Sequence, residues 1–131
     1  MAFSPNGSRP SISGAPQTFT GNVTVDPLYA PNATTSNSGS HVTFAPGARS
    51  AWHTHPGGQM LIVTDGTGWI QEEGGARREI KPGDIIWTPP GVKHWHGGTR
   101  SNGMRHIAIT NSVNGKNVEW MEHVTDEQYG R

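Results

Sequence analysis

Two His-x-His pairs stand out in the sequence, because this pattern can bind a metal ion. His53 and His55 form the first pair, and His94 and His96 form the second. Side chains two residues apart in a strand point to the same face, so each pair can present two imidazoles to one ion. Gln59 follows the first pair after a Pro-Gly-Gly turn, which lets the next strand return its amide toward the same point. A lone histidine is usually a hydrogen-bonded core or surface residue, but two same-face pairs favour a metal site.

Glycines and prolines frame both pairs at fixed intervals. The segments 47–66 and 83–94 resemble the two motifs of the cupin family. They read Gly47-x5-His53-x-His55-x3-Gln59-x6-Gly66 and Gly83-x5-Pro89-x-Gly91-x2-His94. The resemblance implies an all-β, single-domain cupin, which is a conserved barrel also described as a double-stranded β-helix or jelly roll. It also implies one divalent metal bound by His53, His55, Gln59 and His94.

Two positions depart from the usual cupin pattern. Gln59 stands where glutamate is usual, and Gly98 stands where asparagine is usual. Three imidazoles and an amide are all neutral, so the protein would not offset the double charge of the ion. Such an ion is a stronger Lewis acid and favours an anionic additional ligand. Four protein ligands fill the tetrahedral shell of zinc, whereas an ion with six ligands keeps two open positions.

Longer stretches resemble a narrower group, the bacterial manganese-dependent cupin hydroxynitrile lyases. The similar stretches are residues 23–28, 51–56, 93–97 and 120–129. The resemblance implies one metal per subunit, with manganese foremost and iron, cobalt, nickel or zinc as alternatives. It also implies a carbon–carbon lyase that cleaves or forms a cyanohydrin. A metal-dependent dioxygenase or oxidoreductase remains an alternative, as does a non-catalytic cupin that binds a metabolite.

The alternation of side chains along strands predicts the rest of the pocket. If His94 points inward, so does His96, because the two residues share a face of the strand. We expect His96 to lie beside the metal without binding it. Residues of two further strands are expected to line a substrate pocket, namely Ser40, Val42 and Phe44 on one and Ala108 and Thr110 on the other. The resemblance places Ser50, His96 and His106 near the metal as catalytic candidates. Either histidine could act as a general base, and Ser50 could hydrogen-bond a substrate oxygen.

Frequent turn residues predict many short strands and no long helix. The chain has 18 glycines and 10 prolines, which separate expected strands at 19–29, 40–45, 50–55, 59–64, 68–73, 78–80, 84–88, 93–96, 104–111 and 117–124. Residues 1–17 are expected to form a flexible arm, and residues 18–131 the cupin β-barrel domain. Thr125 and Gln128 have the spacing of a capping box for a final helical turn. The strand over 19–29, ended near Pro27, is expected to pair across subunits.

Composition and charge exclude several classes of partner. Ten basic and ten acidic residues give no net charge, which argues against nucleic acid and membrane surfaces as partners. The longest apolar run, residues 60–63, is too short to span a bilayer. The absence of cysteine excludes disulfides and thiolate chemistry. We expect a cytoplasmic protein that binds a small-molecule substrate, and the resemblance to cupins implies a homo-oligomer, a dimer or tetramer.

Overall fold

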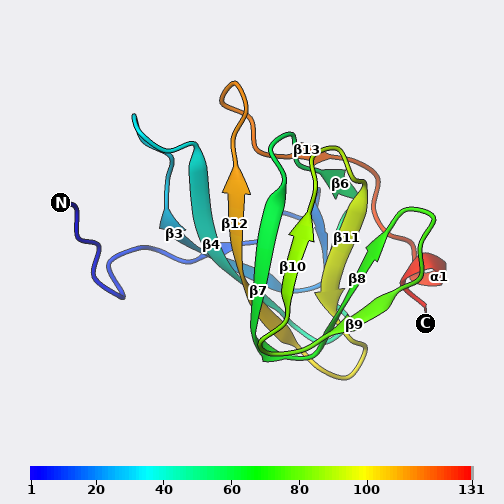
Figure 1. Ribbon diagram of the computed structural model, residues 1–131. Helices are drawn as coiled ribbons and strands as arrows, with labels where there is room; N and C mark the ends of the chain where they lie inside the picture. Colours follow the sequence, from blue (N-terminus) through cyan, green and yellow to red (C-terminus); the bar gives the residue numbers. More distant parts are fainter. Residues whose placement is uncertain (131) are drawn as a thin grey trace.

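Two antiparallel sheets curl toward each other and form the two walls of a β-barrel (Figure 1). The structure is a computed structural model that describes residues 1–130. The first sheet contains, in spatial order, β1 (Ile12–Ser13), β3 (Val23–Tyr29), β4 (Asn37–Phe44), β12 (Met104–Asn111), β7 (Gln59–Gly66) and β10 (Ile85–Thr88). The predicted all-β barrel is confirmed.

The second sheet carries both histidine pairs. Its main path is β13 (Glu119–Trp120), β6 (His53–Thr54), β11 (His94–Gly98), β5 (Arg49–Ser50) and β2 (Phe19–Thr20). The hairpin of β8 (Gly68–Glu72) and β9 (Arg78–Ile80) adds to β11. The helix α1 (Asp126–Tyr129) ends the described chain, and the predicted capping box of Thr125 and Gln128 is present at its start. No helix within residues 1–130 has the length and apolarity needed to cross a membrane.

Alternation along the strands separates the interior from the outer face. On β7, Leu61 and Val63 are buried, whereas Met60, Ile62 and Thr64, which alternate with them, are half-exposed. Phe44 and Met104 join them in the main core between the sheets. A second apolar cluster lies on the other side of the second sheet. It consists of Trp52, Trp95, Val124 and Tyr129.

The segment 19–29 does not form the single strand that the alternation predicts. It breaks at Gly21, whose φ of +80° favours glycine and whose added Cβ would lie 3.0 Å from the Cα of Ala48. Residues before the break join the second sheet as β2, and residues after it join the first sheet as β3. Pro27 does not end the ladder, because β3 continues to Tyr29 through a register shift after the proline.

Both edges of β3 have partners within the chain, which differs from the expected pairing across subunits. β4 pairs along one edge, and β1 pairs with Thr24 and Val25 on the other. Arg9 lies in the same segment as β1 and donates from Nε to the carbonyl of Pro27 at 2.9 Å. A second subunit would therefore have to displace β1 to add to this edge. The flexibility of residues 1–17 stays a prediction.

Residues 117–129 form a segment that we call the C-terminal strap, and it passes over the second sheet. β13 pairs with β6, which places Trp120 opposite His53. Arg49 is buried and donates to the carbonyl of Val124 at 2.8 Å. The Tyr129 hydroxyl donates to the carbonyl of Gly98 at 2.7 Å. These contacts hold the strap against β5 and β11.

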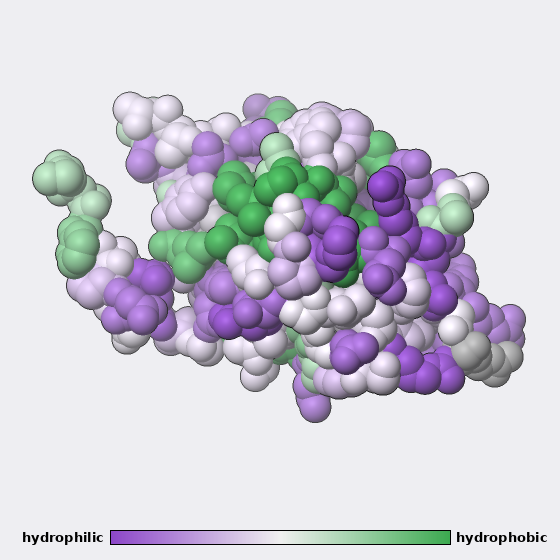
Figure 2. Space-filling model, turned by 60° about the horizontal axis from the view of Figure 1, so that its bottom comes forward, coloured by the Kyte–Doolittle hydropathy of each residue, from purple (hydrophilic) through white to green (hydrophobic). Residues whose placement is uncertain are grey.

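The outer face of the first sheet carries a patch of apolar side chains (Figure 2). Registers across three neighbouring strands arrange it as two rows, Ile85–Ile62–Ile107 and Trp87–Met60–Ile109. Ile85 and Trp87 are the most exposed of these, at 60% and 49%. We call these six residues the outer apolar patch. Large exposed apolar patches mark interaction surfaces.

Two motif glycines are predicted to differ sharply in their tolerance of alanine. Both have positive φ, +75° at Gly66 and +90° at Gly83. An added Cβ would lie 2.0 Å from the Gly103 carbonyl oxygen at Gly66, but would meet nothing within 4 Å at Gly83. Gly83→Ala should therefore cost only the left-handed backbone penalty, about 1–2 kcal/mol. Gly66→Ala should cost about 3 kcal/mol or more, because overpacking adds to that penalty. Urea denaturation measures both, and equal losses would contradict the packing argument.

Candidate metal centre and pocket

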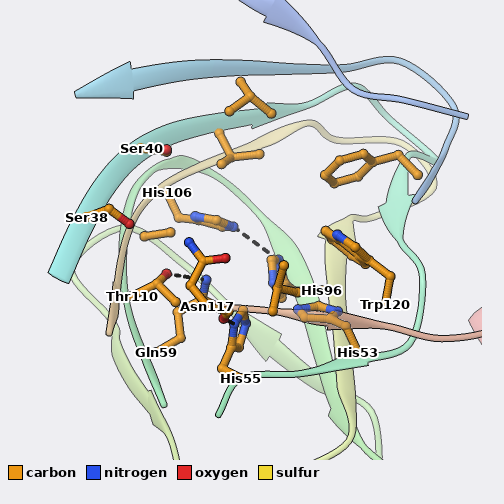
Figure 3. A pocket seen from close by; sticks show the side chains of 15 residues that line it. Ser38, Ser40, His53, His55, Gln59, His96, His106, Thr110, Asn117 and Trp120 are labelled. Atoms are coloured by element: carbon orange, nitrogen blue, oxygen red, sulfur yellow. Dashed lines mark hydrogen bonds between the residues drawn. The ribbon is translucent and has the colours of Figure 1, made fainter. Parts of the chain in front are cut away.

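The pairing of β6 with β11 brings the two His-x-His pairs together. His53 lies opposite His94 in this ladder, and their ring centroids are 4.2 Å apart. The His55 ring lies 4.9 Å from that of His53 and 5.4 Å from that of His94. Gln59 begins β7 in the opposite sheet and lines the same cavity as His53 and His55 (Figure 3). The structure thus brings the rings of the three predicted histidine ligands together, and Gln59 shares a cavity with His53 and His55.

Three imidazoles are oriented in the same way by the backbone. The Nδ1 atoms of His53, His55 and His94 each donate to a carbonyl oxygen, at 2.8, 2.7 and 3.0 Å. The acceptors are the carbonyls of Ala51, Asn117 and Val92, respectively. A carbonyl can only accept, so Nδ1 carries the proton and Nε2 of each neutral ring keeps its lone pair. Metal-binding histidines characteristically have such a partner on the other nitrogen.

Gln59 is oriented for the same purpose. Its Nε2 donates to Oγ1 of Thr110 at 3.0 Å, which leaves Oε1 as the free end of the amide. Oε1 of Gln59 and Nε2 of both His55 and His94 are buried and have no hydrogen-bond partner. Buried polar atoms without partners are costly. A divalent cation would satisfy these atoms, so the donor set fits a metal ion.

Burial keeps these imidazoles in the form that binds metal. Burial lowers the pKa of His94 to about 4. It is also the main cause that lowers the pKa of His53 well below its usual value, with neighbouring His94 and His55 adding to the effect. The pKa of His55 is lowered by burial as well. Metal binding requires a neutral ring, so no proton has to be displaced near neutral pH.

His96 and His106 form a hydrogen-bonded pair beside this centre. Nε2 of His106 lies 3.1 Å from Nδ1 of His96, as the dashed line in Figure 3 shows. Burial lowers the pKa of His106 to about 3 and that of His96 well below its usual value. Nε2 of His96 is buried without a partner. Phe44 packs against both rings, at 5.7 Å from His96 and 5.6 Å from His106.

A second histidine grouping is geometrically close. One ring nitrogen from each of His53, His94 and His96 lies within 4.8 Å of the others. The nitrogen partners distinguish the alternatives. Nδ1 of His96 contacts an imidazole, which can donate or accept, whereas His55 has its Nδ1 on a carbonyl. The backbone carbonyl therefore fixes the tautomer of His55, whereas the tautomer of His96 depends on that of His106.

A cavity of about 220 Å³ opens beside the candidate ligands. Among the predicted site residues, those that line it are Ser40, Val42, His53, His55, Gln59, His96, His106, Ala108 and Thr110. Phe44 is 1% exposed and supports the histidine pair from behind. Ser50 accepts a hydrogen bond from the backbone amide of His96 at 3.1 Å, so it ties β5 to β11. His94 presents its ring to the ligand cluster rather than to this cavity.

Six further residues line the cavity that the strand pattern did not identify. They are Phe19, Val25, Ser38, Asn117, Val118 and Trp120. Ser38 lies two residues before Ser40 on the same face of β4, and Val25 lies opposite Val42 in the β3–β4 ladder. The alternation of side chains could therefore have indicated that Ser38 and Val25 line the cavity. Asn117, Val118 and Trp120 come from the C-terminal strap, whose path no local pattern predicts.

Comparison with known proteins agrees with the fold and the motifs. Residues 40–110 match the cupin domain, and this chain belongs to the cupin family. It is 56% identical over 125 residues to the (R)-mandelonitrile lyase of Granulicella tundricola, with 95% of each chain covered. A cupin-like protein from Thermotoga maritima is 42% identical with a TM-score of 0.87, over 96% of this chain and 95% of that one. A cupin-2 domain protein from Rhodospirillum rubrum shares the fold at 16% identity, with a TM-score of 0.74. The match covers 97% of this chain and 82% of that one.

Proposed function

We propose that this chain is a metal-dependent hydroxynitrile lyase. It cleaves an α-hydroxynitrile to an aldehyde or ketone and cyanide, and it forms the same bond in reverse. The observation that carries the proposal is the cluster of neutral, unpartnered candidate ligand atoms beside the pocket. The relative named as (R)-mandelonitrile lyase supports the same reaction, since it is 56% identical to this chain and the alignment covers 95% of it. Mandelonitrile is therefore the first substrate to test.

The ligands in this proposal are His53, His55, Gln59 and His94, with one divalent ion per subunit. Manganese is the leading candidate, and iron, cobalt, nickel and zinc are the alternatives. A bound ion supplies Lewis acidity, which lowers the pKa of a coordinated hydroxyl and stabilises negative charge. The residues that line the cavity include no carboxylate, so no protein anion would compete with a cyanide leaving group.

His96 is the proposed general base, and His106 positions it. When His106 accepts from Nδ1–H of His96, Nε2 of His96 keeps the lone pair that takes the substrate hydroxyl proton. The oxygen electrons then form the carbonyl bond. The carbon–carbon bond breaks, and its electron pair leaves with cyanide. Transfer of the proton from His96 to cyanide gives hydrogen cyanide and restores the neutral ring.

Loss of a ligand should remove the metal. His53→Ala, His55→Ala and His94→Ala each delete one of four donors, so elemental analysis of the purified variants should find most of the metal gone. His41→Ala is the matched control, because His41 bonds Thr64 and Arg105 away from this cluster. Full metal occupancy in any two of the ligand variants would refute the proposed set.

Anaerobic cleavage of mandelonitrile tests the reaction. The metal-loaded protein should release benzaldehyde and cyanide without oxygen uptake. His96→Ala should lower kcat by about 10²–10⁴, the usual contribution of a general base, while metal content is unchanged. Turnover that requires oxygen would favour a dioxygenase instead. Failure to turn over any hydroxynitrile with any of the five metals would refute the lyase.

We also propose that the chain is a homo-oligomer that associates through the outer apolar patch. The three strands of the outer apolar patch, taken as eight residues long, cover roughly 400 Å² at standard spacings. Each partner of a standard interface buries about 800 Å². The outer apolar patch can therefore supply about half of a symmetric contact with a second copy of this chain.

Charges in the patch should dissociate the oligomer. Ile62→Lys and Ile107→Lys place ammonium groups at the centre and at one end of the first row, so light scattering should report a mass close to one chain. Val113→Lys is the control, because Val113 is 45% exposed but lies outside the patch. A monomeric parent protein would contradict the proposal.

A further inference from the structure

The pocket has two chemically different sides. Phe19 and Trp120 stand on one side, with ring centroids 5.6 Å apart and planes inclined at 63°. The hydroxyl residues Ser38, Ser40 and Thr110 line the opposite side (Figure 3). His53, His55 and His96 lie between the two. A substrate bound at this centre would therefore meet an aromatic wall on one side and hydroxyl groups on the other.

The aromatic wall is fixed directly to the candidate metal centre. Trp120 lies opposite His53 in the β13–β6 ladder, and its ring is 4.8 Å from the His53 ring. Phe19 packs edge-on against Phe44 at 6.2 Å. Trp120 nevertheless remains 39% exposed, so part of its surface is available to a ligand. A substrate group that packs on Trp120 would therefore lie close to His53 in the ligand cluster.

We propose that Phe19 and Trp120 form an aryl-binding subsite that makes the protein selective for aromatic hydroxynitriles. The inference rests on the proposed function and deepens it. Aromatic rings attract one another edge-to-face or offset at centroid distances of 4.5–7 Å, beyond the gain from burial alone. An aryl group packed against the pocket side of both rings can make such contacts with each, while a short alkyl group would leave the wall partly uncovered.

The origin of the wall explains why barrel similarity alone would not predict this selectivity. Phe19 lies in β2 and Trp120 in the C-terminal strap, and both lie outside the matched cupin segment 40–110. The barrel strands carry the metal ligands, whereas the two ends of the chain supply the wall. Cupins that share the barrel but differ at their ends therefore need not share the aryl subsite.

Paired substrates separate the subsite from general damage. Trp120→Leu and Phe19→Leu keep an apolar side chain but remove the ring. For the metal-loaded variants, kcat/KM for mandelonitrile should fall on the order of tenfold, as expected for losing aromatic contacts. The value for the aliphatic 2-hydroxypropanenitrile should change less than about twofold by the same reasoning. Trp120→Phe should retain the preference. Equal losses on both substrates, or no loss on mandelonitrile, would overturn the proposal.

Phe3→Leu is the matched control, since Phe3 is 88% exposed and lies outside both this cavity and the outer apolar patch. It should leave both substrates unaffected. Metal content and thermal unfolding show whether each variant is intact. If Trp120→Leu loses metal because its indole contacts His53, Phe19→Leu carries the test, as Phe19 has no ring contact with the three ligand histidines.

Binding of unreactive alcohols keeps this inference distinct from the lyase proposal. Titration of the metal-loaded protein should show tighter binding of benzyl alcohol than of propan-1-ol, and the Leu variants should lose that difference. A parent that cleaves no hydroxynitrile but shows this preference would refute the lyase and support the subsite. A parent that cleaves hydroxynitriles but binds both alcohols equally would refute the subsite alone.

Discussion

The candidate centre depends above all on the pairing of β6 with β11. Both strands are short, yet their register sets His53 opposite His94 and so joins two pairs that are 39 residues apart in the sequence. Each pair is rigid by itself, because alternate side chains of a strand share a face. The ladder converts two rigid pairs into one cluster. Gln59 completes it from the opposite sheet, with Thr110 holding its amide nitrogen.

Backbone carbonyls then determine what this cluster can do. By accepting from Nδ1, the carbonyls of Ala51, Asn117 and Val92 leave Nε2 of each ring with a lone pair. One of these acceptors, Asn117, belongs to the C-terminal strap. Arg49 and Tyr129 anchor the strap to the second sheet. The far end of the chain therefore helps to orient His55, and the same strap supplies Trp120 to the pocket wall.

The centre joins neutral ligands with a pocket that lacks carboxylates. An ion bound by imidazoles and an amide keeps its full charge, which suits chemistry in which an anion departs. Burial keeps His96 and His106 neutral, so a proton acceptor can sit beside that charge without being repelled by it. The same low-polarity surroundings strengthen each hydrogen bond that positions the groups.

Local rules predicted the short strands, the two same-face histidine pairs and the parity of most pocket residues, and the resemblance to the cupin motifs added the barrel and the four candidate ligands. Periodicity and turn residues are local, and cupin motif spacing encodes how strands return the ligands to one place. Only the tertiary structure decided the rest. Gly21 splits the predicted strand at 19–29 because Ala48, distant in sequence, leaves no room for a side chain. Ser50 holds β11 through the backbone amide of His96, and Phe44 lies behind the histidine pair although its parity matches that of Ser40 and Val42. The strap brings Asn117 and Trp120 to the site through contacts far along the chain, and no pattern within the strap itself specifies where it packs.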